Sequence, residues 1–484
     1  MLVFQYMKII IVGAGFTGVQ LAKRLVSEKN DVVLIDKDEE TVRHLQDRVD
    51  CLVVLANGNN LETLESAGIA KADALVALTE SDELNMITCS LVDSVYPDVF
   101  KIARVRNDDY YANSKLLAAQ KWLEDTSRPP LYGIDVMVHP DVEAAKIIVA
   151  AYEHGAVAEV MEFEDSHYAM ASLDIEAGSR LEGILVQDIK PLVPFRFLIP
   201  VVAHNGKSFL PRGDTKLYAG DTLSLLLDKT QMPEFLKIAG TTGQKPIKRV
   251  ALVGAGKVGS NVADGILKKS GATKFFSKVF DKRFKPKINL VIIEKDRELA
   301  KEAKARFPEA AVINADITDE SFIFEEGDLS NYDLVIAATR NHELNIVTSA
   351  YFKAQGCSKS ICLVTSSSYA AITRNIGIDV VVPIKDTVVD TIMSHLRGKS
   401  VTGIHTLSEG SFEVVEYELP KNSKVDGMAL KDLRSGDETF LILLVNKGES
   451  YAIADGNTVL SGGDKLVFIA DVKDTKHVLE KFGD

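Results

Sequence analysis

The sequence predicts an α/β protein built as a tandem repeat, in which a doubly wound parallel-sheet domain is followed by a small β-rich α+β domain and the pair then recurs. Three observations lead to this prediction. A chain of 484 residues is too long for one hydrophobic core and predicts three to four domains. Short Val/Ile runs alternate with helical segments, which indicates parallel strands covered by helices on both faces. The same residue patterns also occur twice along the chain.

The repeat extends over both kinds of domain. In the parallel-sheet domains, KIIIVGAGFTG at 8–18 returns as RVALVGAGKVG at 249–259. In the β-rich domains, period-two alternation and Gly-rich turns indicate antiparallel sheets, and 173–189 aligns with 417–433. The order of domains is therefore A-B-A-B. We place the four domains at residues 7–140, 141–239, 248–384 and 385–484.

Two segments fall outside the repeated pattern. Residues 240–248, GTTGQKPIK, are rich in Gly and Thr, and we interpret them as the linker between the two halves. Residues 270–287 have no counterpart in the first half and are dominated by Lys and Phe. We expect this stretch to be a surface insertion that serves as an interface loop.

Each half carries a Gly-x-Gly-x-x-Gly sequence between a strand and a helix. Three glycines at this spacing allow a tight turn, close approach of a pyrophosphate and close packing of helix on strand. Free backbone N–H groups at the helix N-terminus then face the phosphates. The pattern predicts two Rossmann-like nucleotide-binding domains. The loop residues are Gly13, Ala14, Gly15, Phe16, Thr17 and Gly18 in the first half, and Gly254, Ala255, Gly256, Lys257, Val258 and Gly259 in the second.

An acidic residue ends the next strand of each half. Asp36 follows the first loop by about 20 residues, where a carboxylate accepts hydrogen bonds from ribose hydroxyls. Glu294 takes this role in the second half, farther along because 270–287 intervenes. An acid at this position favours NAD or ATP over NADP, because it would repel a 2′-phosphate. The adjacent Lys37 and Lys295 weaken this argument, but we expect both to lie in solvent. The alternative for the second half is a degenerate copy that keeps its glycines for packing only.

Further polar residues are expected at the carboxyl edge of each parallel sheet, where open α/β sheets bind their ligands. Thr79 and Glu80 follow the strand 74–78, and Thr339 is the aligned residue of the second half.

Two arginines follow on the next strand. Arg104 and Arg106 share one side of this strand by its period of two, and paired arginines hold phosphates by forked hydrogen bonds. A surface or interface ion pair is the alternative role. The aligned segment 361–366, ICLVTS, has no arginine, so we expect the two sites to differ in ligand or affinity.

Composition excludes several classes of function. The net charge of -13 without a basic tract argues against a nucleic-acid partner. Four cysteines without a CxxC pair favour free thiols over disulfides or zinc, and the nine scattered histidines argue against a metal site. No apolar run approaches the about 20 residues of a membrane span, and residues 1–6 do not resemble a signal peptide. We expect a cytoplasmic protein with no membrane span of its own.

No catalytic residue is expected either. A dehydrogenase needs an acid/base residue beside the nicotinamide, and the β-rich domains show no evident His/Asp pair and no nucleophile elbow. His139, His167 and His405 are isolated in the sequence, and we expect them at the surface. The sequence therefore favours nucleotide as a signal rather than as a substrate. An NAD-dependent oxidoreductase with an unusually small substrate domain is the rival hypothesis.

The A-B-A-B order, the GAGxxG loop, LIDKD at 34–38, Asn57-Gly58, LTESDELN at 78–85 and IARVR at 102–106 together resemble the TrkA family. Its members are peripheral NAD-binding subunits of Trk potassium uptake and consist of tandem regulator-of-potassium-conductance (RCK) domains. The resemblance covers nearly the whole chain. It implies a regulatory subunit on the inner face of the membrane that gates an integral-membrane potassium translocator of the TrkH/TrkG type. It also implies a ring of four tandem chains.

The same resemblance implies NAD(H) and ATP/ADP as regulatory ligands. In the first half they would contact the glycine loop, Asp36, Asn57, Gly58, Thr79, Glu80 and Arg104, with Arg106 near the phosphates. In the second half Asp316 stands where the first half has Asn57. We expect Arg104 and Arg106 to distinguish ATP from ADP. A subunit of another ion channel or antiporter remains an alternative.

Overall fold

The structure is a computed structural model that describes most of the chain. It covers residues 7–111, 133–153, 160–163, 166–205, 207–239, 247–276, 288–319, 329–397, 400–407, 411–433, 439–448 and 450–483. Most of the expected linker, 240–246, lies outside the described residues, as does 277–287 of the expected insertion. Residues 270–276 are not a loop, because helix α9 (Lys257–Phe276) continues through them.

The first half opens with the predicted parallel sheet. Ile9, Ile10 and Ile11 of its central strand are all fully buried, as expected for a strand covered on both faces. Within the described residues the sheet has six strands in the order β3-β2-β1-β4-β5-β6. Its elements are β1 (Lys8–Val12), α1 (Phe16–Ser27), β2 (Asp31–Asp36), α2 (Glu39–Leu45), β3 (Leu52–Leu55), α3 (Leu61–Ser66), β4 (Ala74–Ala77), α4 (Asp82–Val95), β5 (Phe100–Arg104) and β6 (Val136–Val138).

The second half repeats this architecture strand for strand. Its described parallel sheet has the order β14-β13-β12-β15-β16-β17. The elements are β12 (Arg249–Val253), α9, β13 (Asn289–Glu294), α10 (Arg297–Arg306), β14 (Ala311–Asn314), β15 (Leu334–Ala337), α12 (His342–Ala354), β16 (Lys359–Val364), α13 (Ser367–Asn375) and β17 (Val380–Pro383).

Each parallel sheet is followed by a helix and an antiparallel sheet. The first antiparallel sheet has the order β10-β9-β11-β8-β7 and the second β18-β19-β22-β20-β21. The first set is α6 (Pro140–Glu153), β7 (Val160–Glu162), β8 (Tyr168–Asp174), α7 (Val186–Ile189), β9 (Phe197–His204), β10 (Lys207–Phe209), β11 (Thr222–Asp228) and α8 (Met232–Ile238). The second set is α14 (Ile384–Leu396), β18 (Val401–Leu407), β19 (Phe412–Glu418), β20 (Phe440–Asn446), β21 (Tyr451–Ile453), β22 (Lys465–Asp471) and α15 (Val472–Phe482). The predicted fold class is therefore confirmed.

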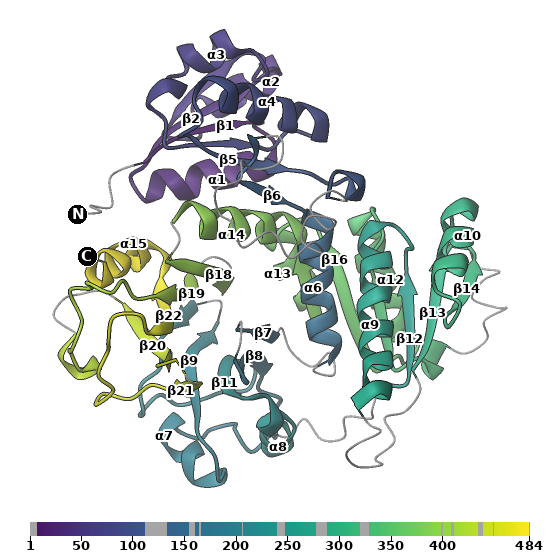
Figure 1. Cartoon of the computed structure of the whole chain (residues 1–484). Helices are drawn as coiled ribbons and strands as arrows, with labels where there is room; N and C mark the ends of the chain where they lie inside the picture. Colours follow the sequence, from purple (N-terminus) through teal and green to yellow (C-terminus); the bar gives the residue numbers. More distant parts are fainter. Residues whose placement is uncertain are drawn as a thin grey trace.

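The halves exchange helices in a way that the sequence did not indicate. Helix α6 of the first half packs against α9 of the second, and α14 of the second half packs against α1 of the first (Figure 1). One apolar core accordingly joins Leu21 and Leu25 of α1 to Val388 and Ile392 of α14. The two antiparallel sheets share a further apolar cluster. Each parallel sheet is thus completed by a helix from the other half.

Candidate functional site

The two glycine loops adopt the same backbone geometry. Gly13 and Gly254 have φ values of +109° and +103°, in the left-handed region that favours glycine. A Cβ atom on Gly18 would lie 1.9 Å from the carbonyl oxygen of Gly13, and one on Gly259 would lie 1.9 Å from that of Gly254. These glycines therefore form the turn and the close helix–strand contact. Gly15 and Gly256 face open space, with nothing within 4 Å of an added Cβ. A ligand can reach the backbone there.

The predicted acidic residues hold both loops in place. Asp36 accepts hydrogen bonds from the N–H of Ala14 at 2.6 Å and of Asp38 at 3.0 Å. Glu294 accepts the corresponding bonds from Ala255 at 2.6 Å and from Asp296 at 2.8 Å. The acid of the second half is farther from its glycine loop in sequence, but it lies in the same position relative to that loop in the structure.

A buried asparagine supports the site in each half, and sequence reasoning did not single it out. Asn85 accepts from the N–H and hydroxyl of Thr79 at 2.9 and 2.7 Å and donates to the carbonyls of Thr79 and Arg104 at 3.0 and 2.8 Å. Asn345 makes the same bonds to Thr339 and Leu363. Both side chains are fully buried. The recurrence of Glu-Leu-Asn in both halves was the available signal.

We expect Asn345→Leu to lower the opening free energy of strands β15 and β16 by about 3 kcal/mol. The leucine would leave the N–H of Thr339 and the carbonyl of Leu363 buried without this partner, at about 1–3 kcal/mol for each group. Amide hydrogen exchange of the two strands measures the effect. Asn331→Leu, at an exposed position, is the control, and equal exchange in the two variants would contradict the supporting role.

The two predicted arginines are engaged by protein groups. Arg104 donates to the carbonyl of Thr79 at 2.8 Å, and burial together with the neighbouring Arg106 lowers its pKa. Arg106 forms a forked contact with the buried carboxylate of Asp141, at 3.2 Å from Nε and 3.1 Å from Nη2. The hydrogen bond to Asp141 raises the pKa of Arg106. About half of the Arg106 side chain is exposed.

The arginines of the first half also reach the second glycine loop. A cavity of about 870 Å³ is lined by Gly254, Gly256, Lys257 and Val258 together with Glu294, Asp316 and Thr339, and on its other side by Thr17, Arg104 and Arg106. The ammonium group of Lys257 donates to the carbonyl of Arg106 at 2.6 Å. A smaller cavity beside it is lined by the cations of Arg106, Lys257 and Arg340 and, opposite in charge, by the carboxylates of Glu80, Asp82 and Glu83, with Ser81.

The cations at the second site come partly from the other half. The segment 361–366 lacks arginine, but the cavity receives Arg104 and Arg106 from the first half and Arg340 from its own. The sequence did not indicate this exchange of cations, and a difference in ligand or affinity between the two sites stays a prediction.

The remaining predicted residues take different positions. Lys37 is exposed as expected, whereas Lys295 is exposed but pairs with Asp316 at 2.9 Å. Hydrogen bonds from Thr318 and from Lys295 lower the pKa of Asp316 to about 2. Asn57 is exposed.

Two of the loop-edge residues pack against the protein. Gly58 lies against Val12, where a Cβ would come within 2.2 Å of a methyl group. Phe16 of the first loop lies beneath the ammonium of Lys385 at 4.9 Å.

Two expectations about histidines were wrong. His139 is buried, with its ring 5.3 Å from that of Tyr111, rather than at the surface. A His/Asp pair does exist in the first β-rich domain, because β9 brings His204 to 2.5 Å from the buried carboxylate of Asp221. Asp221 also accepts from the N–H of Tyr218 and so stabilises a turn. Neither cavity beside the glycine loops contains His204.

The described part of the chain shows few other reactive groups. Cys89, Cys357 and Cys362 are buried free thiols whose pKa values are raised by burial, to about 12, 11 and 12. Within the same residues, no group of three His, Cys, Asp or Glu side chains is placed to hold a metal ion. Nor does any described helix combine the length and apolarity needed to cross a bilayer.

Two Rossmann-like domains with matching glycine loops are each followed by a β-rich domain, and residues of both halves line the cavity at the second loop. This arrangement defines a tandem protein of the nucleotide-binding fold class. The TrkA-N domain model matches residues 9–123 and 250–384, and the TrkA-C domain model matches residues 414–483. The chain belongs to the TrkA family.

Similar proteins extend over the same length. The Trk system potassium uptake proteins TrkA of Azorhizobium caulinodans and Haemophilus influenzae are each 27% identical to this chain, with 98% of both chains covered in each comparison. Among solved structures, the GsuK channel bound to NAD matches with a TM-score of 0.55 at 18% identity, over 99% of this chain and 79% of that one. The GsuK RCK domain matches with a TM-score of 0.56 at 17% identity, over 99% and 95%. These likenesses support the fold.

Proposed function

We propose that the protein is a nucleotide-sensing regulatory subunit that gates a membrane potassium-uptake protein. NAD(H), ATP and ADP are its regulatory ligands, and it does not turn them over. The names of the full-length relatives support the link to potassium uptake. One observation of the structure carries the sensing role, which is that residues of both halves line the cavities at the second glycine loop.

A phosphate group in the cavity at the second glycine loop would contact both halves of the chain at once. The Gly256 loop offers backbone N–H groups at a helix N-terminus, and Arg106 and Lys257 bring cations from opposite sides. A ligand shifts a conformational equilibrium only if it binds one arrangement better than the other. A nucleotide whose phosphates bind Arg106 and Lys257 at once would favour the arrangement in which these two residues lie side by side, and so would have this differential affinity.

The structure favours Arg106 over Arg104 as the residue that distinguishes ATP from ADP. The guanidinium of Arg104 is mostly buried and donates to a backbone carbonyl, so it supports the edge of β5. Arg106 is half exposed in both cavities, and its pair with Asp141 can open when a phosphate competes. An added γ-phosphate carries charge that a guanidinium binds by forked hydrogen bonds.

The partner is an integral-membrane potassium translocator of the TrkH/TrkG type, and the protein acts at the cytoplasmic face of the membrane. Four tandem chains form the ring that transmits the nucleotide signal. The acidic net charge of -13 makes direct adsorption to an anionic membrane surface unfavourable, so contact through a protein partner is the better route.

Calorimetric titration of the full chain with ATP, ADP, NAD and NADH should show two sites per chain without turnover. One site is expected at each glycine loop, since the two loops and their acids have the same geometry. The tightest ligand identifies the signal. Absence of binding at millimolar concentration would overturn the sensing role, and steady reduction of NAD by a hydroxy or amino acid would establish an enzyme instead.

A further inference from the structure

The two helix exchanges between the halves are equivalent in position but differ in chemistry. Aligning the glycine loops places Arg24 of α1 opposite Gly265 of α9. At the α6–α9 contact, a Cβ on Gly265 would lie 2.6 Å from a methyl group of Val149, so the helices touch closely through apolar atoms. At the α1–α14 contact, Arg24 enters a group of charged residues instead.

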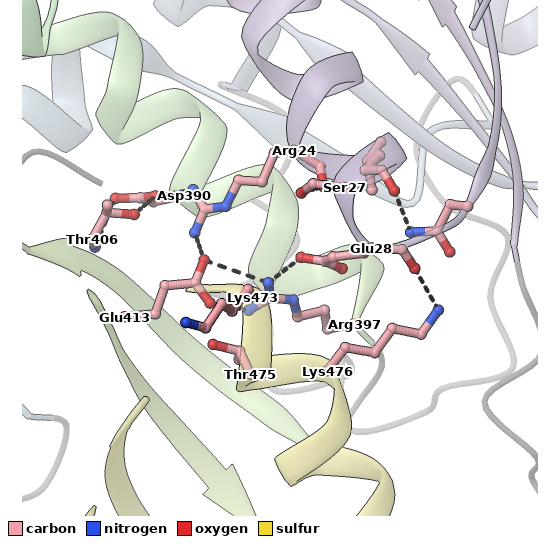
Figure 2. A network of polar contacts seen from close by, with 12 residues as sticks. Arg24, Ser27, Glu28, Asp390, Arg397, Thr406, Glu413, Lys473, Thr475 and Lys476 are labelled. Carbon is pink, nitrogen blue, oxygen red and sulfur yellow. Dashed lines mark hydrogen bonds and ion pairs between the residues drawn. The ribbon is translucent and has the colours of Figure 1, made fainter. Parts of the chain in front are cut away.

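The charged group joins α1 to the last β-rich domain (Figure 2). The Nη1 of Arg24 donates to Asp390 of α14 at 2.6 Å, and its Nη2 pairs with Glu413 of β19. Arg397, which follows α14, donates to Glu413 at 2.8 Å and pairs with Glu28 at the end of α1. We call these five residues the Arg24 cluster.

Burial makes these ion pairs difficult to separate. Glu413 is fully buried and the side chain of Arg397 is 6% exposed. Burial alone would raise the pKa of Glu413, but attraction to Arg397 and Arg24 outweighs it and holds the pKa at about 2. Removing one partner from such a pair leaves a buried charge uncompensated, which is strongly unfavourable. Movement of α1 must therefore carry the C-terminal domain along or exchange one pair for another.

The equivalent positions on the other contact carry different side chains. The repeat places Lys146 opposite Asp390 and Ala169 opposite Glu413. Lys146 is exposed and pairs with Glu143 of its own helix, and Ala169 belongs to an apolar cluster. A cavity of about 1140 Å³ lies between the two contacts and is lined by Arg24 and Asp390 from one and by Ile147 and Gly265 from the other. Arg24 already contacts the carboxylates of Asp390 and Glu413, and the cavity leaves its side chain room to shift toward either of them.

Helix α1 begins in the first glycine loop, and Arg24 lies about two turns further along. We propose that the Arg24 cluster transmits occupancy of the first glycine-loop site to the C-terminal β-rich domain, and that the second site has no matching route because α9 is fixed by an apolar contact. This role rests on the proposed nucleotide binding. It adds that the signal runs from the first site to the C-terminal domain and that the second site does not send it.

The test combines hydrogen exchange with calorimetry on the full chain. The probe is ATP at saturation, and the readout is exchange in β19 and α15. In the unmodified protein the exchange in these elements should differ between the ligand-free and the ATP-saturated protein by at least about fivefold, the lower end of usual coupling. Asp390→Asn and Arg24→Met should reduce this difference to less than about twofold while the first site still binds. Lys23→Met, an equal charge change at an exposed position of α1, should behave like the unmodified protein.

Two glycine variants test the asymmetry. Gly18→Ala, aimed at the first site, should abolish the exchange response, and Gly259→Ala, aimed at the second, should retain it. An unchanged response in both Asp390→Asn and Arg24→Met, or a response that follows the second site, would overturn the proposal. So would nucleotide binding in the unmodified protein without any response in β19 or α15. Failure to bind nucleotide at all would appear in the calorimetry and would instead reject the proposed function.

Discussion

Replacing Arg106 with methionine should weaken ATP binding about 30-fold and ADP binding by less than about threefold. A charge-assisted hydrogen bond contributes about 1.5–3 kcal/mol, and 2 kcal/mol corresponds to about 30-fold in affinity. Arg106 projects into both cavities at the junction of the halves, where a terminal phosphate would add charge. The adenosine end would contact other residues, so the loss of affinity should be larger for ATP, with three phosphates, than for ADP, with two.

Titrations of ATP and ADP into Arg106→Met and into Arg212→Met measure this effect. Arg212 is exposed on the first β-rich domain and serves as the control for removal of one positive charge. Equal losses for both ligands would show that Arg106 acts on the protein rather than on the γ-phosphate. No loss for either ligand would place the phosphates elsewhere.

Gly259→Ala should eliminate one of the two nucleotide sites while the other keeps its affinity. The added methyl group would lie 1.9 Å from the carbonyl oxygen of Gly254, so the start of α9 has to move away from β12. Overpacking of this kind costs about 1–3 kcal/mol. Because the displaced helix N-terminus is also the expected phosphate site, we expect affinity there to fall by at least about tenfold. Gly18→Ala should act in the same way on the first site.

Gly256→Ala separates the effect on packing from the effect on the ligand. Its Cβ would meet nothing within 4 Å, so the loop and the helix should stay in place. Loss of binding in this variant would show that the ligand approaches the backbone at that point. Gly456→Ala, whose added Cβ would lie 3.5 Å from the Cβ of Lys431, is the neutral control. Calorimetric stoichiometry distinguishes the outcomes, and two intact sites in Gly259→Ala would contradict the assignment of the loop.

Local pattern was sufficient to predict much of this fold. The buried isoleucines of β1, the glycine loops and the acids Asp36 and Glu294 are specified by residues close together in sequence, and the repeat tests each of them twice. The same local information gave the antiparallel sheets of the small domains.

Contacts between distant segments were beyond that reasoning. The bond from Lys257 to the carbonyl of Arg106 joins residues 151 positions apart, and the bond from Arg24 to Asp390 spans 366. Sequence periodicity indicates which face of an element is apolar, but it does not indicate which partner covers that face. The helix exchange determines which element covers each apolar face. It also brings Arg104 and Arg106 of the first half into the cavity at the second glycine loop.

The exchange of α6 and α14 gives one polypeptide the internal architecture of a dimer with two equivalent contacts. In a dimer of identical subunits every substitution appears at both contacts, so a charged contact and an apolar one cannot coexist. Joining the halves in one chain removes that constraint, since position 24 can be arginine while position 265 is glycine. Covalent fusion thereby allowed one contact to specialise in transmission while the other remained a fixed support.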